Sequence, residues 1–436
     1  SVRGNRQAFH YKEILRGVSR LSTRRCKSMK IYKREKYLKK IRPFYDSDII
    51  KIITGIRRCG KSCILKLIVD ELKEKGVSED HIIYIQLDKK NFKWIKTPDE
   101  LEKTIDSYIK DAGFYYLFID EVQNVRGFES VVQGYHEEEN FSIFLTGSNS
   151  YLLSDEISTK LTGRYIKFEV FTLDFQEYEE MKRFFGNPLA LNPMDEFKEY
   201  IINGGFPKSL EFKEQRAKQL YTESIINEIF EKDIRKRNKI RNKLVFERIQ
   251  SYLIGNYIAT FSLNSVYEYF RKEENINITK VTIRKYIDIL LSAKILYKCE
   301  RFDQKSKRVL SGECKFYLAD LSIFFAMNTD NRINYGASLE NIVYLYLLSN
   351  DYKVSVGRIG KFECDFITRD PDNQYAYIQV SQTIADKATE EREYRPFALI
   401  RDGYPRYLLT LDTLKNQRDG VKHLDIIDVV LGKVKI

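Results

Sequence analysis

The stretch GIRRCGKS, residues 55–62, decides the fold, because it matches the pattern GxxxxGK[ST] that binds phosphate groups. An apolar run, Ile49–Thr54, precedes it, and a run that favours a helix, residues 61–75, follows it. A strand, a glycine-rich turn and a helix start are the context in which this pattern cradles an anion. The predicted nucleotide-binding residues are Gly55, Ile56, Arg57, Arg58, Cys59, Gly60, Lys61, Ser62 and Cys63.

Four side chains are expected to carry the chemistry of a magnesium nucleotide. The Lys61 ammonium suits the β- and γ-phosphates, and the Ser62 hydroxyl suits Mg²⁺. The apolar run Leu117–Ile119 leads into Asp120 and Glu121. An acidic pair at the end of a buried strand predicts that Asp120 joins the Mg²⁺ shell and that Glu121 polarises the attacking water. The predicted ligands are therefore ATP and Mg²⁺.

Three further residues are weaker candidates. Ser148 follows a fourth apolar run, where it would sense the γ-phosphate or simply form a turn. Arg164 opens a fifth run, and it would act as an arginine finger, within the chain or in a neighbouring subunit, or form a surface ion pair. Gln123 is a candidate for orienting the water.

Five short apolar runs alternate with helical segments between residues 48 and 170. They are Ile49–Thr54, Ile82–Leu87, Tyr115–Ile119, Phe141–Leu145 and Tyr165–Val170. Such spacing predicts an α/β fold in which helices cover both faces of a parallel sheet. Residues 173–240 instead favour helices.

These motifs resemble a family of bacterial and archaeal AAA-type ATPases that carry an uncharacterised C-terminal domain. The strings that carry the resemblance are TGIRRCGKS, FIDEVQ, FLTGSNSYLLS, LTGRY, FTLDFQEY, NGGFPKSL, EKDIRKRNKI, KFYLADLSIFFA, GASLENIVYLYL and ECDFI. The resemblance covers about Met29 to Asp412. It implies ATP binding and hydrolysis but no particular biological role.

The net charge of +12 belongs to the N-terminal segment. Residues 1–40 hold 14 Lys and Arg against 2 Asp and Glu, and the rest of the chain is balanced. Nucleic-acid binding by the whole body therefore gains no support from charge. We expect residues 1–28 to be an upstream extension, with an Arg- and Ser-rich transit peptide as the alternative.

The six cysteines form no CxxC pair and no Cys/His cluster, and the chain has four histidines, so neither a disulfide framework nor a His-rich metal site is expected. This usage favours a reducing, cytoplasmic compartment. No apolar stretch is long enough to predict a membrane span.

Residues 244–310 have the pattern of a winged helix. Two helices are expected, Ser262–Phe270 and Thr279–Ser292, followed by a strand over residues 293–302 and a basic loop over residues 305–308. The second helix would enter the major groove of double-stranded DNA. The alternative is a lid or protein-interaction module.

Residues 336–412 resemble the restriction-endonuclease-like fold. Asp365 fills the first metal-binding position, and Glu340 and Glu363 are further acidic candidates. The usual Glu-x-Lys is replaced by Gln379-Val380-Ser381. Glutamine is a poor Mg²⁺ ligand beside carboxylates, so nuclease activity is not expected.

The expected domains are an AAA-like core over residues 29–172, a helical lid over 173–243, a winged-helix unit over 244–310 and a restriction-endonuclease-like domain over 311–436. The leading hypothesis is an ATPase that acts as a nucleotide-driven switch or motor. The alternatives are a DNA-binding regulator gated by ATP and an ATP-dependent nuclease. Arg164 acting on a neighbour would require an oligomer.

Overall fold

The computed structural model describes residues 31–147, 161, 163–236, 238, 240–328, 332–415 and 417–436. The chain divides into two compact units, Ser1–Lys33 and Arg34–Ile436. Only residues 31–33 of the first unit are described, so every helix and strand below belongs to the second. The expected extension, residues 1–28, lies outside the described residues. Each helix in the described part of the chain is too short or too polar to traverse a bilayer.

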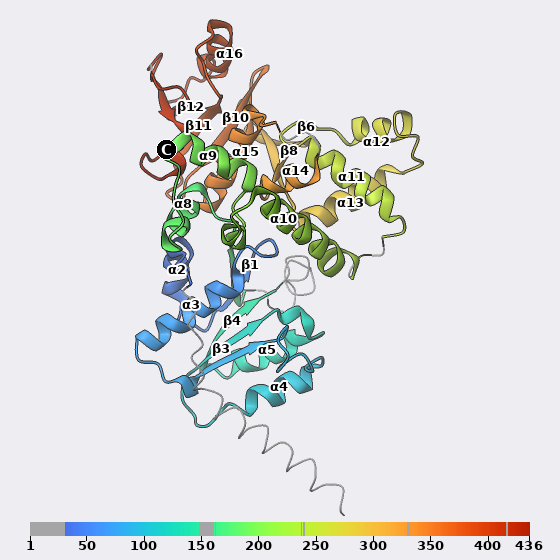
Figure 1. The fold of residues 1–436 in the computed structure, drawn as a ribbon, viewed down its shortest axis with the longest axis vertical. Coiled ribbons are helices and arrows are strands. Elements are labelled where there is room, and N and C mark those ends of the chain that lie inside the picture. Colours follow the sequence, from blue (N-terminus) through green and yellow to red (C-terminus); the bar gives the residue numbers. More distant parts are fainter. Residues whose placement is uncertain are drawn as a thin grey trace, which may run out of the picture. The chain divides into compact units, whose positions relative to one another are not determined.

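Five parallel strands form the first sheet, in the order β2-β3-β4-β1-β5 (Figure 1). The strands are β1 (Ile50–Thr54), β2 (Ile82–Gln86), β3 (Tyr115–Asp120), β4 (Phe141–Thr146) and β5 (Tyr165–Glu169). The three central strands are buried along their whole length, as continuous apolar runs of this kind require. The predicted parallel sheet is confirmed.

Helices cover both faces of this sheet. The helices are α3 (Lys61–Glu74), α4 (Pro98–Asp106) and α5 (Phe128–Glu137). The apolar sides of α4 and α5 share one core with alternate residues of the strands, whereas α3 lies outside that core and packs on β3 and β4. A capping box between Thr97 and Glu100, with Pro98 at the first helical position, fixes the start of α4.

Short helices precede and follow the sheet. They are α2 (Glu35–Ile41), η1 (Arg42–Phe44), α8 (Phe175–Phe184), α9 (Pro193–Asn203), η4 (Pro207–Glu211), α10 (Gln215–Ile229) and the π-helical segment η5 (Phe230–Arg235). The expected helical character of residues 173–240 is confirmed. The turn before η4 needs glycine, because a Cβ at Gly204 would lie 1.7 Å from Asp320 and a Cβ at Gly205 would lie 2.1 Å from the Leu173 carbonyl oxygen.

The middle of the chain alternates helices with a small sheet. Its elements are α11 (Lys243–Gly255), β6 (Thr260–Phe261), α12 (Leu263–Lys272), α13 (Lys280–Ser292), β7 (Leu296–Asp303) and β8 (Arg308–Leu318). Strands β7 and β8 form an antiparallel hairpin, and β6 pairs with β8. Both predicted helices are present. β8 runs across the domain boundary that we expected between residues 310 and 311.

The C-terminal part is an α/β domain with a mixed sheet. Its elements are α14 (Ser322–Met327), α15 (Tyr335–Ser349), β9 (Lys353–Ile359), β10 (Phe362–Arg369), β11 (Tyr375–Val380), α16 (Lys387–Ala398), β12 (Arg406–Thr410), β13 (Val421–Asp425) and α17 (Ile426–Val430). The sheet order is β13-β12-β11-β10-β9-β7-β8-β6. Because β7 pairs with β9, the middle and C-terminal parts share one sheet.

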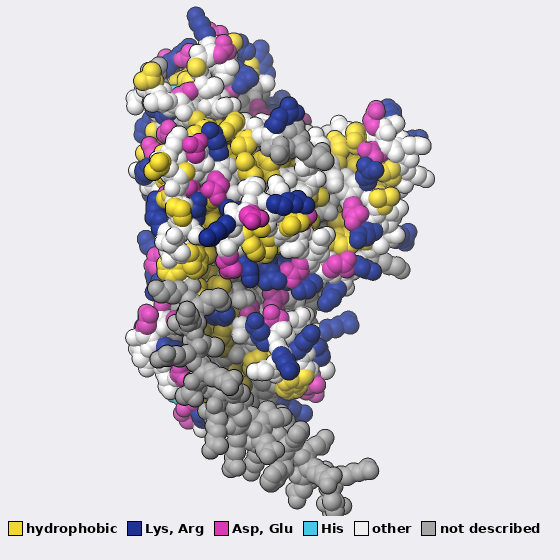
Figure 2. Space-filling model, viewed as in Figure 1, with side chains coloured by type: hydrophobic (Ala, Val, Ile, Leu, Met, Phe, Trp, Pro, Cys, Tyr) yellow, Lys and Arg dark blue, Asp and Glu magenta, His cyan; other side chains and the backbone are white. Residues whose placement is uncertain are grey.

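Basic and acidic side chains are interspersed on the face drawn in Figure 2. This mixture agrees with the balanced charge of the chain beyond residue 40. The side drawn in Figure 2 is therefore mixed in charge rather than strongly basic.

Candidate nucleotide site

The phosphate loop joins β1 to α3 through two glycines with positive φ. Gly55 has a φ of 142°, and a Cβ there would lie 2.1 Å from the Val170 carbonyl oxygen. Gly60 has a φ of 107° and precedes α3 in the left-handed conformation. Only glycine fits both requirements without strain, so the loop can lie close to the end of β5 and deliver the N-terminus of α3.

The Lys61 side chain lies over the loop. Its ammonium donates to the carbonyl oxygens of Gly55 at 2.9 Å and Ile56 at 3.2 Å. Lys61 is buried, with 8% of its surface exposed. Phosphate oxygens that enter the loop would compete for the same ammonium protons, as the predicted role of Lys61 requires.

Ser62, Asp120 and Thr146 meet at the carboxyl ends of β3 and β4. The Ser62 hydroxyl donates to Asp120 Oδ1 at 3.0 Å, and the Thr146 hydroxyl donates to the same oxygen. Burial raises the pKa of Asp120, while these two hydroxyls act to lower it. A carboxylate and a hydroxyl at this separation fit Mg²⁺, which prefers oxygen ligands and takes the rest from phosphates and water. No group of three or more His, Cys, Asp or Glu side chains within the described residues is arranged to hold a metal alone.

Glu121 follows Asp120 in a left-handed backbone conformation, with φ of 60°. Its N–H donates to Thr146 Oγ1 at 3.1 Å, and its carboxylate accepts a hydrogen bond from the Gln123 amide. An acidic residue at a positive φ is uncommon, and such strain is often found where a side chain must point in a particular direction. Thr146 was missed, although a polar residue closing an apolar strand was visible in the sequence.

The two loop arginines reach the helical segment after the sheet. Arg57 forms a two-pronged ion pair with Asp233 of η5, at 2.7 and 2.8 Å. Arg58 pairs with Glu228 of α10 at 2.9 Å. The sequence predicted only that these arginines belong to the loop. Their partners lie more than 160 residues away, so no local pattern could have identified them.

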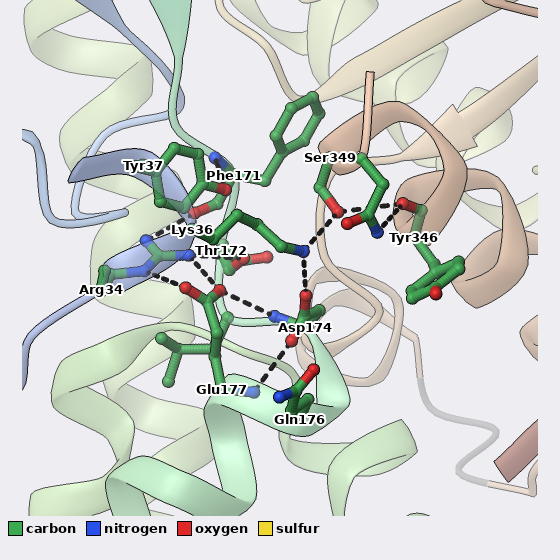
Figure 3. Close-up of polar contacts among 12 residues, drawn as sticks. Arg34, Lys36, Tyr37, Phe171, Thr172, Asp174, Gln176, Glu177, Tyr346 and Ser349 are labelled. Atoms are coloured by element: carbon green, nitrogen blue, oxygen red, sulfur yellow. Dashed lines mark hydrogen bonds and ion pairs between the residues drawn. The ribbon is translucent and has the colours of Figure 1, made fainter. Parts of the chain in front are cut away.

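Arg34 is a buried residue of the site that sequence reasoning missed (Figure 3). Its guanidinium donates at 2.9 Å to the carbonyl oxygen of Cys59 in the phosphate loop and, at the same distance, to that of Phe171 after β5. It also forms a bidentate pair with Glu177, which belongs to the capping box of α8. Arg34 thereby ties the loop backbone to the start of the helical segment.

The neighbouring helix α2 extends these contacts to the C-terminal domain (Figure 3). Lys36 forms an ion pair with Asp174, the N-cap of α8, and donates to the Ser349 hydroxyl at the end of α15. Lys40 donates to the Ser349 carbonyl oxygen and pairs with Asp351. Three distant parts of the chain therefore meet at α2.

Of the two cysteines in and beside the loop, only Cys59 fits a packing role. Cys59 is fully buried, and burial raises the pKa of its thiol, whereas Cys63 is exposed. A thiol with a raised pKa is a poor nucleophile. Contact of either residue with a nucleotide stays a prediction.

Arg164 does not lie beside the loop of its own chain. β1 and β5 are parallel with Ile50 opposite Tyr165, so Arg164 precedes β5 at the amino edge of the sheet, about one strand length (~16 Å) from the loop at the carboxyl edge. It forms an ion pair with Glu137 at 3.3 Å. A finger role within one chain is therefore wrong, because the strand separates the arginine from the phosphates. Ser148 lies outside the described residues.

The acidic candidates of the C-terminal domain enclose a lysine that the sequence did not predict there. Lys315 of β8 contacts Glu340 at 2.9 Å and Glu363 at 2.8 Å, and the Tyr317 hydroxyl donates to Glu340. Burial acts to lower the pKa of Lys315, but the surrounding carboxylates, Glu340 first, raise it above its ordinary value. These acids already hold a cation from the chain itself.

The remaining candidates on β10 and β11 are tied to one another. The Gln379 side chain accepts from the Asp365 N–H at 2.7 Å and donates to Glu393 at 2.7 Å. Asp365 in turn accepts from the Val380 N–H at 2.8 Å. The Ser381 hydroxyl donates to the Thr383 carbonyl oxygen. Gln379 and Ser381 therefore form hydrogen bonds within the domain, to the backbone at Asp365 and Thr383.

Two family models match parts of the chain. Residues 47–179 match the model described as the AAA domain, and residues 194–333 match a domain of unknown function (DUF8612). The first match covers less than a third of the chain, and the parallel sheet and the phosphate loop agree with it. The restriction-endonuclease-like assignment of the C-terminal domain stays a prediction.

Two relatives, one from a bacterium and one from an archaeon, align with most of this chain. An uncharacterized protein of Haemophilus influenzae is 29% identical over 91% of this chain and 98% of its own length. An uncharacterized protein of Methanocaldococcus jannaschii is 28% identical over 80% of this chain and 78% of its own.

Similar solved structures include two archaeal proteins. The Walker-type ATPase paby2304 of Pyrococcus abyssi has a TM-score of 0.49 at 16% identity, over 68% of this chain and 96% of its own. The ORC2 protein of Aeropyrum pernix has a TM-score of 0.38 at 12% identity, over 67% and 89%.

Proposed function

From an AAA-type P-loop domain at residues 47–179, we propose that the protein binds ATP with Mg²⁺ and hydrolyses it to ADP and phosphate. The observation that carries the proposal is the meeting of Ser62 and Asp120 at 3.0 Å, directly before Glu121. A hydroxyl and a carboxylate for the metal stand beside a second carboxylate for the water, and this is the minimum set for metal-assisted phosphoryl transfer.

Different residues are proposed to bind the phosphates, hold the metal and activate the water. Lys61 binds the β- and γ-phosphates, because its ammonium is already held over the loop. Bound Mg²⁺ would be held by Ser62 and Asp120 and would neutralise charge that develops on the phosphates. Glu121 orients the water and accepts its proton, and the hydrogen bond from Gln123 fixes the direction of that carboxylate.

We also propose that nucleotide turnover switches the arrangement of the helical segment. Arg57 and Arg58 extend from the phosphate loop to Asp233 and Glu228, so a change in the loop backbone acts directly on α10 and η5. Arg34 offers a second route, from Cys59 in the loop to Glu177 in α8. A switch needs such an element whose position depends on the bound ligand.

The test is steady-state ATP turnover by the purified chain with and without Mg²⁺, beside Lys61→Ala, with Lys66→Ala as a matched lysine control on the same helix. The proposal is supported if turnover requires Mg²⁺, is lost in Lys61→Ala and is retained in Lys66→Ala. Equal turnover in wild type and Lys61→Ala would assign it to a contaminant and reject the proposal.

DNA binding is a second candidate, favoured by a specific cluster. The order α11-β6-α12-α13-β7-β8 agrees with the predicted winged-helix unit and supports this candidate. Exposed basic residues lie on α13 and at the turn of the β7–β8 hairpin: Lys280, Arg284, Lys285, Lys305, Lys307 and Arg308. Within the described residues none of these forms an ion pair with a carboxylate, so their charges are available to phosphates.

Retention on immobilised double-stranded DNA at increasing salt tests this candidate. Arg284→Ala with Lys285→Ala should elute at clearly lower salt, because each phosphate contact adds to the salt dependence. Lys387→Ala with Arg395→Ala on α16 removes the same charge elsewhere and should elute with wild type. Coincident elution of all three proteins would reject DNA binding through α13.

We do not extend the proposal to a nuclease. Lys315 holds Glu340 and Glu363, and Gln379 holds the backbone of Asp365. These contacts support a structural role for the cluster, in joining β8 to the C-terminal domain. Cleavage of plasmid DNA in Mn²⁺ would contradict that role.

A further inference from the structure

The Arg57–Asp233 ion pair differs from the surface pairs of this protein in burial and geometry. The guanidinium faces the carboxylate with two prongs, Nε to Oδ2 at 2.7 Å and Nη2 to Oδ1 at 2.8 Å. The side chains are 16% and 8% exposed. Two parallel charge-assisted hydrogen bonds with little solvent make a strong and directional contact.

Arg57 also lies close to the groups that would act on the γ-phosphate. It stands within the phosphate loop, between Gly55 and Lys61. Burial acts to lower its pKa, but the carboxylates of Asp233, Glu121 and Glu228 raise it above its ordinary value. The guanidinium is therefore within electrostatic reach of Glu121, the residue assigned to the attacking water.

The neighbouring Arg58 provides a contrast. Its side chain is 51% exposed and pairs with Glu228 at 2.9 Å, whereas the Arg57 side chain is 16% exposed. The two arginines carry the same charge on the same loop, yet only Arg57 forms the buried, two-pronged pair with Asp233.

A nucleoside triphosphate changes the balance at Arg57. Its γ-phosphate brings oxygens that match a guanidinium fork as well as a carboxylate does, and with more charge. A diphosphate brings no such group. Asp233 and the γ-phosphate are thus alternative partners for one arginine.

We propose that Arg57 is a further catalytic residue of the ATPase, an arginine that contacts the γ-phosphate within its own chain, and that Asp233 is the partner it leaves when ATP binds. This inference rests on the proposed ATPase function. The exchange releases η5 from the loop. Since η5 is followed in the chain by α11, it also gives the nucleotide a direct effect on the middle domain.

Asp233→Asn and Arg57→Gln separate this role from a purely structural one. Each substitution removes the same ion pair, so a structural role predicts that both change nucleotide binding in the same direction. The proposal predicts opposite directions. Asp233→Asn removes the closer carboxylate and leaves Arg57 only the longer pair with Glu228 at 3.8 Å, so it strengthens binding of the triphosphate. Arg57→Gln removes the contact with the γ-phosphate and weakens binding.

The experiment measures the affinity of each variant for ADP and for a non-hydrolysable ATP analogue, both with Mg²⁺, together with kcat for ATP. Arg57→Gln should lower the affinity for the analogue by ~10-fold while leaving that for ADP within about twofold, and kcat should fall by ~10³-fold, the range known for arginine fingers. Asp233→Asn should raise the affinity for the analogue by roughly a few-fold, because the state in which Asp233 holds Arg57 no longer competes with binding. Arg235→Gln, which removes an exposed arginine of η5 that pairs with Glu231, is the matched control and should stay within about twofold of wild type in all three quantities.

Equal loss of ADP and analogue binding in Arg57→Gln would overturn the proposal, as would weaker analogue binding in Asp233→Asn. Failure of the underlying function looks different, because the wild-type protein itself would then bind no analogue or show no turnover. Melting temperatures of the variants, measured without nucleotide, establish that each is folded.

Discussion

Replacing Arg34 by methionine tests the account of how the phosphate loop is held. The change keeps an unbranched side chain of similar length but removes every donor. Glu177 then loses its bidentate partner while 7% exposed, and the carbonyl oxygens of Cys59 and Phe171 lose theirs. Breaking a buried pair on one side costs about 3–5 kcal/mol. Because Glu177 still accepts from the Asp174 N–H at 3.4 Å, we expect the lower end, about 3 kcal/mol.

The assay is denaturant unfolding followed by the fluorescence of Trp94, the single tryptophan, which lies between β2 and α4 in the AAA-type domain. Arg235→Met is the control, because its pair with Glu231 spans one turn of η5 at an exposed site and contributes only ~0.3–0.5 kcal/mol. Adding Glu177→Gln to Arg34→Met should recover part of the loss, since no charged group is then left buried. A loss below about 1 kcal/mol for Arg34→Met, or full additivity in the double variant, would refute the reasoning.

Three further predictions concern buried charges. Burial lowers the pKa of Lys51 to about 7, whereas the pKa in the unfolded chain is ~10.4. Because the unfolded chain binds more protons between these two values, the stability against urea should rise from pH 7 to pH 9. The rise should be smaller in Lys51→Met. Burial raises the pKa of Asp120 above its value in the unfolded chain, so the contribution of Asp120 to stability falls as the pH rises between the two pKa values. Asp120→Asn should therefore raise the melting temperature without nucleotide, and it should abolish Mg²⁺-dependent turnover. Unchanged turnover would count against the metal role of Asp120. Lys315→Met leaves Glu340 buried without its cation and should cost ~3–5 kcal/mol, measured by hydrogen exchange of β8, whereas Lys298→Met at an exposed pair should cost less than ~1 kcal/mol.

The nucleotide-binding sheet could be predicted because its signals are local. Each strand is a short apolar run, and the loop needs glycine at Gly55 and Gly60, so spacing alone located both. Asp120 and Glu121 followed from their position at the end of a buried strand. The strand boundaries differ from the prediction by about one residue.

The contacts that hold the loop could not be predicted, because they join residues far apart in the chain. Arg34 precedes Cys59 by 25 positions, and Asp233 follows Arg57 by 176. Nothing around Arg34 distinguishes it from the other basic residues of the N-terminal segment. Only folding shows which arginine is buried against carbonyl oxygens.

Two expectations failed for reasons of geometry. The pattern LTGRY suggested that Arg164 approaches the phosphates, but the parallel register of β1 and β5 puts it at the opposite edge of the sheet. The boundary near residue 310 falls inside β8, which pairs with β7 in the hairpin and delivers Lys315 to the acids of the C-terminal domain. A change of composition does not mark a domain boundary when one strand serves both sides.

The central claim is that Glu121 drives hydrolysis at a site that binds ATP through Lys61. The most direct measurement is rapid mixing of ATP with Glu121→Gln, followed by separate quantification of bound ATP and released phosphate. The account predicts ATP binding within about twofold of wild type and a rate of phosphate release lower by at least ~10²-fold, the scale of a general-base contribution. Phosphate release at the wild-type rate would contradict it.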